Sequence, residues 1–83
     1  MKILYFAWLR ERVGLAEETL DPPPAVVTVA DLARWLAGRD DGHAAAFADP
    51  AVVRAALDRR HAKPDTPLGQ TREVAFFPPM TGG

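Results

Sequence analysis

Apolar residues gather in two short runs near the opposite ends of the chain, 2–7 (KILYFA) and 72–77 (REVAFF), and both runs predict buried strands. Alternation puts Ile3 and Tyr5 on one face of the first strand and Leu4 and Phe6 on the other. In the last strand it puts Val74 and Phe76 on one face and Ala75 and Phe77 on the other. Both faces are therefore apolar, which is unusual for an antiparallel sheet with one side in water.

The middle of the chain predicts one amphipathic helix, from about Val29 to Ala37. Its apolar residues recur at helical spacing and form one stripe: Val29, Leu32, Ala33, Leu36 and Ala37. Thr28 is placed to cap the helix, and Asp31 follows three residues later in a variant of the capping box. Trp35 falls outside the stripe, so we expect it at an edge of the core or partly exposed.

Weaker patterns predict the other elements. They are a helical turn over 8–13, a strand over 16–20, a short helix over 44–48, a strand over 51–57 and a short strand near 61–63. This order predicts an α+β domain with the β-grasp arrangement of ubiquitin, in which one main helix crosses a mixed sheet and the first and last strands are central and parallel. We expect the domain to span residues 1–77, with 78–83 as an extended C-terminal tail.

Composition narrows the function classes. The chain has 83 residues, of which 48% are hydrophobic and 25% charged, as in an ordinary globular domain. It has no cysteine, which excludes a disulfide framework and a cysteine nucleophile. A net charge of −1 argues against a general nucleic-acid binder. The apolar run 3–9 is too short for a membrane span and lacks a signal-peptide cleavage site, so we expect a cytoplasmic protein that binds neither nucleic acid nor membrane.

Few side chains suggest chemistry within the chain itself. His43 and His61 lack metal-ligand spacing and are interpreted as polar surface residues. The acidic pairs 17–18 and 40–41 are interpreted as solvated turns. The internal glycines are isolated, so the sequence has no phosphate-binding loop. We expect no active site, stably bound cofactor or metal site in this chain.

The C-terminal tail is the most specific feature of the sequence. It consists of Pro78, Pro79, Met80, Thr81, Gly82 and Gly83. The two prolines have no backbone N–H to donate to a sheet and favour an extended backbone, so we expect a stiff, extended segment directly after the last strand. Six residues at ~3.3 Å each can reach roughly 20 Å, and glycines without a Cβ can thread a narrow channel. A frayed terminus is the alternative, but we favour an arm that places the carboxylate of Gly83 in the active site of another protein.

A carboxylate must be activated before it reacts, because its charge resists attack and oxide is a poor leaving group. The simplest activated form is an acyl-adenylate that a partner makes from ATP. A sulfur nucleophile could then displace AMP and leave a thiocarboxylate, whereas an amine would give an isopeptide, as in protein tagging.

Three blocks of sequence carry a family resemblance: ILYFAWLRERVG (3–14), TVADLARWLA (28–37) and, most specifically, EVAFFPPMTGG (73–83). With these blocks, the chain resembles the small, sulfur-carrier subunits of molybdopterin synthase over essentially its whole length. The resemblance implies a ubiquitin-like β-grasp fold and a Gly83 that an E1-like enzyme adenylates. A sulfur donor, such as a cysteine desulfurase or a rhodanese-type protein, is then implied to supply the thiocarboxylate.

The resemblance further implies that the tail enters the large subunit of the synthase and gives sulfur to cyclic pyranopterin monophosphate. Two charged carriers supply the two sulfurs of the molybdopterin dithiolene, in a heterotetramer with one carrier at each end. The chain is then no enzyme on its own, and ATP is used by the activating partner.

Partner contacts are predicted at two places outside the tail. Family members use the sheet face that would bear Phe6 and Phe77, although a loop could instead cover this pair. The basic residues Arg59, Arg60 and His61 form either a solvated hairpin end or a docking patch for an acidic partner. Relatives often have Asn and then mostly uncharged residues where this chain has DRRH (58–61), and an Asp-Gly-type turn where it has LGQTREV (68–74).

Two other functions stay open. One is a sulfur carrier for thiamine or tRNA thiolation, although thiamine carriers are usually shorter and lack FFPP. The other is a ubiquitin-like protein modifier or binding module, which would form isopeptides through Gly83 or bind partners without its terminal glycines.

Overall fold

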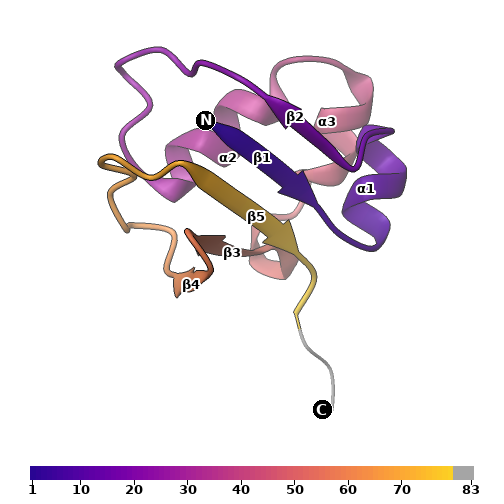
Figure 1. Ribbon diagram of the computed structural model, residues 1–83. Helices are drawn as coiled ribbons and strands as arrows, with labels where there is room; N and C mark the ends of the chain where they lie inside the picture. The colour runs from indigo at the N-terminus through magenta and orange to yellow at the C-terminus, as the bar shows by residue number, and fades with distance from the viewer. Residues whose placement is uncertain (80–83) are drawn as a thin grey trace.

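The computed structural model describes residues 1–79 and shows a five-stranded mixed sheet against which the helices pack (Figure 1). In chain order, the elements are β1 (Lys2–Tyr5), α1 (Trp8–Val13), β2 (Glu17–Thr19), α2 (Val29–Ala37), α3 (Asp41–Ala46), the 3₁₀-helix η1 (Pro50–Val52), β3 (Arg54–Leu57), β4 (Arg60–Ala62) and β5 (Glu73–Phe77). The predictions made for Met80, Thr81, Gly82 and Gly83 lie outside the described residues.

The two ends of the domain meet in the centre of the sheet. β1 and β5 are parallel neighbours, with Ile3 opposite Val74 and Tyr5 opposite Phe76. β2 lies antiparallel to β1 on one side. On the other side β3 lies antiparallel to β5, and β4 lies antiparallel to β3, which gives the order β2-β1-β5-β3-β4. This order confirms the predicted α+β, β-grasp fold with its first and last strands central and parallel.

The hydrophobic core lies between one face of the central strands and α2. On the strands, Ile3, Tyr5, Val74 and Phe76 are at most 2% exposed, and on the helix, Val29, Leu32 and Leu36 are at most 5% exposed. Fully burying a large apolar side chain stabilises a fold by about 1.5–3 kcal/mol. This layer is therefore the main source of stability, and its members are the residues that the alternation and the helical spacing predict.

α2 begins with the predicted capping box. The Thr28 hydroxyl accepts the backbone N–H of Asp31 at 3.1 Å, and the Asp31 carboxylate accepts the N–H of Thr28 at 3.0 Å. Two of the backbone donors that a helix leaves free at its start are thereby satisfied. Trp35 is partly exposed, as expected, and the Arg39 guanidinium lies 5.1 Å from its ring centre.

Two predicted elements were wrong in their bounds for local reasons. The short helix predicted at 44–48 is α3, which begins at Asp41 because the Asp40 carboxylate caps it by accepting the N–H of His43 at 2.9 Å. The first part of the predicted strand 51–57 is η1, because Pro50 is preorganised for a helical turn and Asp49 caps that turn. Only 54–57 remain as β3, and the following short strand covers 60–62.

Candidate functional site

β5 carries the chain from the middle of the sheet toward the tail (Figure 1). It is hydrogen-bonded on both sides, to β1 and to β3, so its last residue, Phe77, is held opposite Arg54. On the other side the pairing continues one step past β1, because the N–H of Phe6 donates to the carbonyl oxygen of Phe76 at 3.1 Å. Pro78 and Pro79 follow directly and are partly exposed. The predicted arm therefore has a rigid origin.

The two phenylalanines predicted to bind partners lie at one end of the sheet: Phe77 ends β5, and Phe6 follows directly after the neighbouring strand β1. Tyr5 pairs with Phe76 and both are buried in the core, so the next residues, Phe6 and Phe77, have neighbouring positions. Phe6 is 47% exposed and Phe77 is half-buried. The predicted set of core-facing residues is thus confirmed. We call the opposite side of the sheet the open face; partner binding by it stays a prediction.

The basic segment lies on the tight hairpin between β3 and β4. Asp58 and Arg59 have φ of 46° and 72°, and two successive positive φ angles are typical of a two-residue hairpin turn. Arg59, Arg60 and His61 are all exposed, and the His61 ring packs edge-on against Phe77 with 5.3 Å between ring centres. The register of three strands therefore joins the basic hairpin to the open face. No sequence signal could have revealed this contact.

Asp58 gives a structural reason for one departure from related sequences. Its Oδ1 accepts the backbone N–H groups of Arg72 at 3.1 Å and Glu73 at 3.0 Å. Asp is also among the residues that tolerate the positive φ of this position. The carboxylate thus ties the β3–β4 turn to the start of β5 and positions the two strands that carry the candidate contact residues.

A polar network that the sequence did not predict lies on the core side of the sheet. His43 is only 3% exposed; its Nδ1 lies 2.8 Å from Asp40 Oδ1 and its Nε2 lies 2.7 Å from Glu18 Oε2. The Tyr5 hydroxyl donates to the same Glu18 oxygen at 2.7 Å. The interpretation of His43 as a surface residue was therefore wrong, as was that of Glu18 as part of a solvated turn. The network joins β1, β2 and α3.

Hydrogen bonding governs the ionisation of the carboxylates in this network. Burial alone would raise the pKa of Glu18, but hydrogen bonds from His43 and Tyr5 outweigh it and hold this pKa below its usual value of 4.5. The backbone N–H and ring of His43 likewise lower the pKa of Asp40. Burial and the bond to Glu18 raise the pKa of Tyr5.

The buried polar side chains of the described part of the chain all have hydrogen-bond partners. No buried side-chain nitrogen or oxygen among residues 1–79 lacks a hydrogen-bond partner. Within the same range, no group of three or more potential ligand side chains is placed to hold a metal ion. The helices described there are all too short to cross a membrane.

Comparison with known proteins gives matches over the whole chain. The sequence profile of the ThiS family matches residues 3–83. The molybdopterin synthase sulfur carrier subunit of Escherichia coli (strain K12) is 40% identical over 85 aligned positions, which cover 100% of this chain and 99% of that protein. A solved structure from Pyrococcus furiosus, described as subunit 1 of molybdopterin converting factor, has a TM-score of 0.76 and 28% identity over 95% of both chains.

SAMP1 from Haloferax volcanii has the same fold, with a TM-score of 0.72 over 100% of this chain and 98% of that one, at 24% identity. The family match and the full-length identity to the Escherichia coli protein go beyond a shared fold. The chain therefore belongs to the ThiS family, among the ubiquitin-like β-grasp sulfur carriers that include the small subunit of molybdopterin synthase.

Proposed function

We propose that this chain is the sulfur-carrier subunit of a cytoplasmic molybdopterin synthase and that its reagent is the carboxylate of Gly83. The observation that carries the proposal is the 40% identity to the Escherichia coli sulfur carrier subunit over the full length of both proteins. The placement of β5 adds physical support, because a strand bonded on both sides anchors the root of an arm that must reach into another protein.

The proposed chemistry takes place in the active sites of partners. In an E1-like enzyme, the Gly83 carboxylate attacks the α-phosphorus of ATP, which releases pyrophosphate and leaves an acyl-adenylate. A sulfide equivalent, supplied as a persulfide by a cysteine desulfurase or a rhodanese-type protein and released by a thiol reductant that cleaves the S–S bond, then forms a C–S bond as the C–O bond to AMP breaks. The product is a C-terminal thiocarboxylate.

Transfer to the substrate regenerates the carrier. The thiocarboxylate sulfur attacks an electrophilic carbon of cyclic pyranopterin monophosphate in the large synthase subunit, and a C–O bond at that carbon breaks as the C–S bond forms. Water then cleaves the resulting thioester, so that the sulfur stays on the pterin and Gly83 recovers its carboxylate. Two charged carriers supply the two sulfurs of the dithiolene, which fits a heterotetramer with one carrier at each end.

The partner contacts follow from the geometry around the root of the tail. Phe6 and Phe77 are proposed to bury the open face against the partner, while Arg59, Arg60 and His61 steer the encounter from its rim. Exposed rim charges act more on the rate and register of association than on affinity. Pro78 and Pro79 direct the arm, and Met80 to Gly83 enter the partner.

Intact-mass spectrometry of the chain coexpressed with its activating enzyme tests this chemistry. We expect a species heavier by the replacement of one oxygen with sulfur, and we expect its loss when Gly83 is deleted or one residue is added after it. Thermal unfolding of both variants should match the unmodified chain. Persistent absence of the heavier species beside an activating enzyme that forms the adenylate would contradict the proposal.

Two further outcomes separate the alternative functions. Rescue of a strain that lacks its molybdopterin synthase carrier, without rescue of strains that lack a thiamine or tRNA thiolation carrier, supports the molybdopterin pathway. Isopeptides between Gly83 and lysines of other proteins in cell extracts would instead point to a protein modifier.

A further inference from the structure

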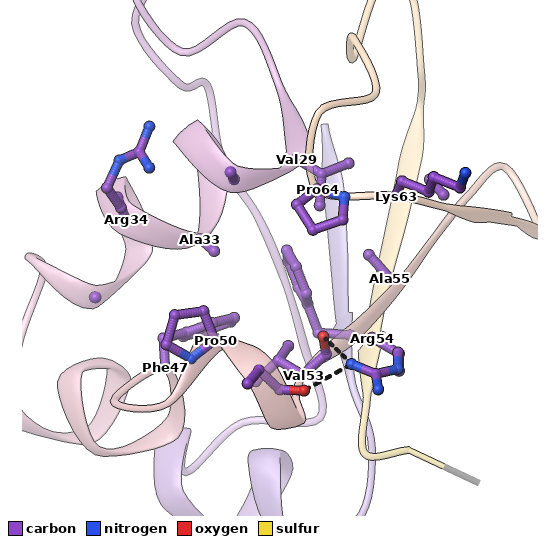
Figure 2. A pocket seen from close by; sticks show the side chains of 15 residues that line it. Val29, Ala33, Arg34, Phe47, Pro50, Val53, Arg54, Ala55, Lys63 and Pro64 are labelled. Carbon is purple, nitrogen blue, oxygen red and sulfur yellow. Dashed lines mark hydrogen bonds between the residues drawn. The ribbon is translucent and has the colours of Figure 1, made fainter.

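An apolar groove of about 430 Å³ opens between α2 and the β3–β4 edge of the sheet (Figure 2). We call it the α2–β3 groove. Phe47 and Phe76 line it and are only 6% and 1% exposed, so the groove reaches the hydrophobic core. Phe76 faces α2, whereas its neighbour Phe77 belongs to the open face. The apolar floor of the groove is therefore distinct from the open face, although Arg54, which lies opposite Phe77, borders both surfaces.

Small side chains create the space in this groove. Six alanines from α2, η1, β3 and β4 line it: Ala30, Ala33, Ala37, Ala51, Ala55 and Ala62. A closed apolar cavity of about 150 Å³ is enough to hold one benzene ring. The α2–β3 groove is nearly three times as large, so it can accept two or three apolar side chains of a partner.

The charged residues along the groove are all basic. Arg34 on α2, Arg54 on β3 and Lys63 directly after β4 line it, and no acidic residue is among its described lining residues. Because the whole chain has a net charge of −1, this cluster is a local feature. The Arg54 Nη1 is held by donating to the carbonyl oxygen of Ala51 at 2.8 Å.

The three cations do not converge on one point. Figure 2 shows the ends of Arg34 and Lys63 extending away from the groove on opposite sides, from α2 and from the strand segment. Arg34 already pairs with Asp31 at 2.5 Å, which leaves Arg54 and Lys63 as the main cations for a ligand. A small anion could contact only one wall, whereas a helix about 10–12 Å across can contact both.

We propose that the α2–β3 groove binds an amphipathic helix of a partner protein, with apolar anchors in the groove and acidic residues along its flanks. Anchors at positions i, i+3 or i+4, and i+7 form the continuous stripe that such a groove accepts. Acidic flanks complement the basic walls and oppose cationic partners. The apolar anchors would thus enter on the core side of the sheet, while Arg54, which lies opposite Phe77, borders both the groove and the open face.

A pair of synthetic helical peptides tests the proposal on the full chain. One carries a leucine stripe flanked by glutamates, and its counterpart has lysine in place of each glutamate. Nitrogen-15 labelled protein at physiological salt is titrated with each peptide. We expect the glutamate peptide to shift the amide signals of Ala33, Ala55 and Ala62, and to bind about tenfold more tightly than the lysine peptide, as two or three exposed charge pairs allow.

Charge reversal provides the matched control. Lys63→Glu should weaken binding of the glutamate peptide about fivefold and strengthen binding of the lysine peptide, because one exposed charge contact changes sign. Arg10→Glu makes the same charge change on exposed α1, away from the groove, and should leave both affinities within about twofold, because screening at this salt concentration acts over ~8 Å.

Filling the groove provides a second test. Ala33→Leu should abolish binding of the glutamate peptide, and Ala51→Leu on exposed η1 should weaken it. The second variant keeps the test informative if Ala33→Leu folds poorly. Equal affinity for both peptides, shifts confined to the open face, or unchanged binding by folded filling variants would each overturn the proposal. None of these results depends on Gly83 or on sulfur transfer, so the proposed function is tested separately.

Discussion

Replacing Glu18 with alanine should destabilise the domain far more than its position on a short edge strand suggests. In the folded protein one oxygen of this side chain accepts from both the Tyr5 hydroxyl and the His43 ring, each at 2.7 Å. Both donors belong to residues that are at most 3% exposed. Glu18→Ala therefore removes the hydrogen-bond partner that the described residues offer to the buried Tyr5 hydroxyl and to the buried Nε2 of His43.

The size of the loss follows from the penalty for those donors. Leaving a buried donor without a partner costs about 1–3 kcal/mol. The Glu18 side chain is 14% exposed, so water can partly replace it and the total should be about 2–3 kcal/mol. At about 0.05–0.15 kcal/mol per residue, a domain of this size has roughly 4–12 kcal/mol of stability. The variant should thus lose a large share of it.

Urea unfolding followed by tryptophan fluorescence at neutral pH measures this loss. Glu17→Ala is the matched control, because Glu17 is 56% exposed and its pair with Lys2 at 3.4 Å is a surface contact that contributes at most ~1 kcal/mol. Tyr5→Phe completes a double-mutant cycle. Tyr5→Phe should lower the free energy of unfolding less in the Glu18→Ala background than in the parent chain, because there it removes a donor that is already unpaired.

The same experiment in acid checks the charge of Glu18. Its folded-state pKa lies below 4.5, so its ionised form contributes stability that is fully present above that value and is lost as the pH falls through the folded-state pKa. The difference in the free energy of unfolding between the parent chain and Glu18→Ala should therefore become smaller in acid. A loss at neutral pH no larger than that of Glu17→Ala, or a gap that does not narrow, would refute this account of the network.

Three further changes test other parts of the structure by the same unfolding measurement. Gly42→Ala should cost about 1–3 kcal/mol, because its Cβ would lie 2.6 Å from a carbonyl oxygen of α1, while Gly38→Ala, with its nearest atom at 3.6 Å, should be close to neutral. Thr28→Ala should cost about 0.5–2 kcal/mol by removing the cap of α2, and full stability without the hydroxyl would disprove the capping role. Phe77→Ala should lower the free energy of unfolding by well under the ~3–5 kcal/mol expected for buried Phe76→Ala, yet weaken partner binding. A larger loss of stability for Phe77→Ala than for Phe76→Ala would place Phe77 in the core.

Local patterns in the sequence were enough to predict the layers of this fold. The core-facing residues of β1 and β5 follow from strict alternation, and α2 follows from its apolar stripe and from the Thr28–Asp31 capping box. The α3 boundary was wrong because the interpretation relied on a run of alanines, while the helix starts where Asp40 supplies a cap. Capping by one side chain here outweighs the composition of the residues that follow.

The polar network could not be predicted in the same way. Glu18 and His43 are 25 positions apart, and neither fits an apolar periodicity, so a sequence reading treats both as surface residues. Only the pairing of β2 with β1 and the packing of α3 bring them to Tyr5. The contact of His61 with Phe77 likewise depends on strand register. Side-chain pairs that require tertiary structure are thus the part of the candidate site that patterns along the chain do not reveal.

Because β5 is the central strand of the sheet, the fold of the domain depends on the same strand that leads into the tail. Without residues 73–77, the sheet would separate into two isolated two-stranded hairpins, β1–β2 and β3–β4, and such hairpins are marginal in water. A chain cut before its last strand should therefore unfold and not persist as a folded domain without the tail. The domain remains folded only while it retains the strand that bears the root of the tail.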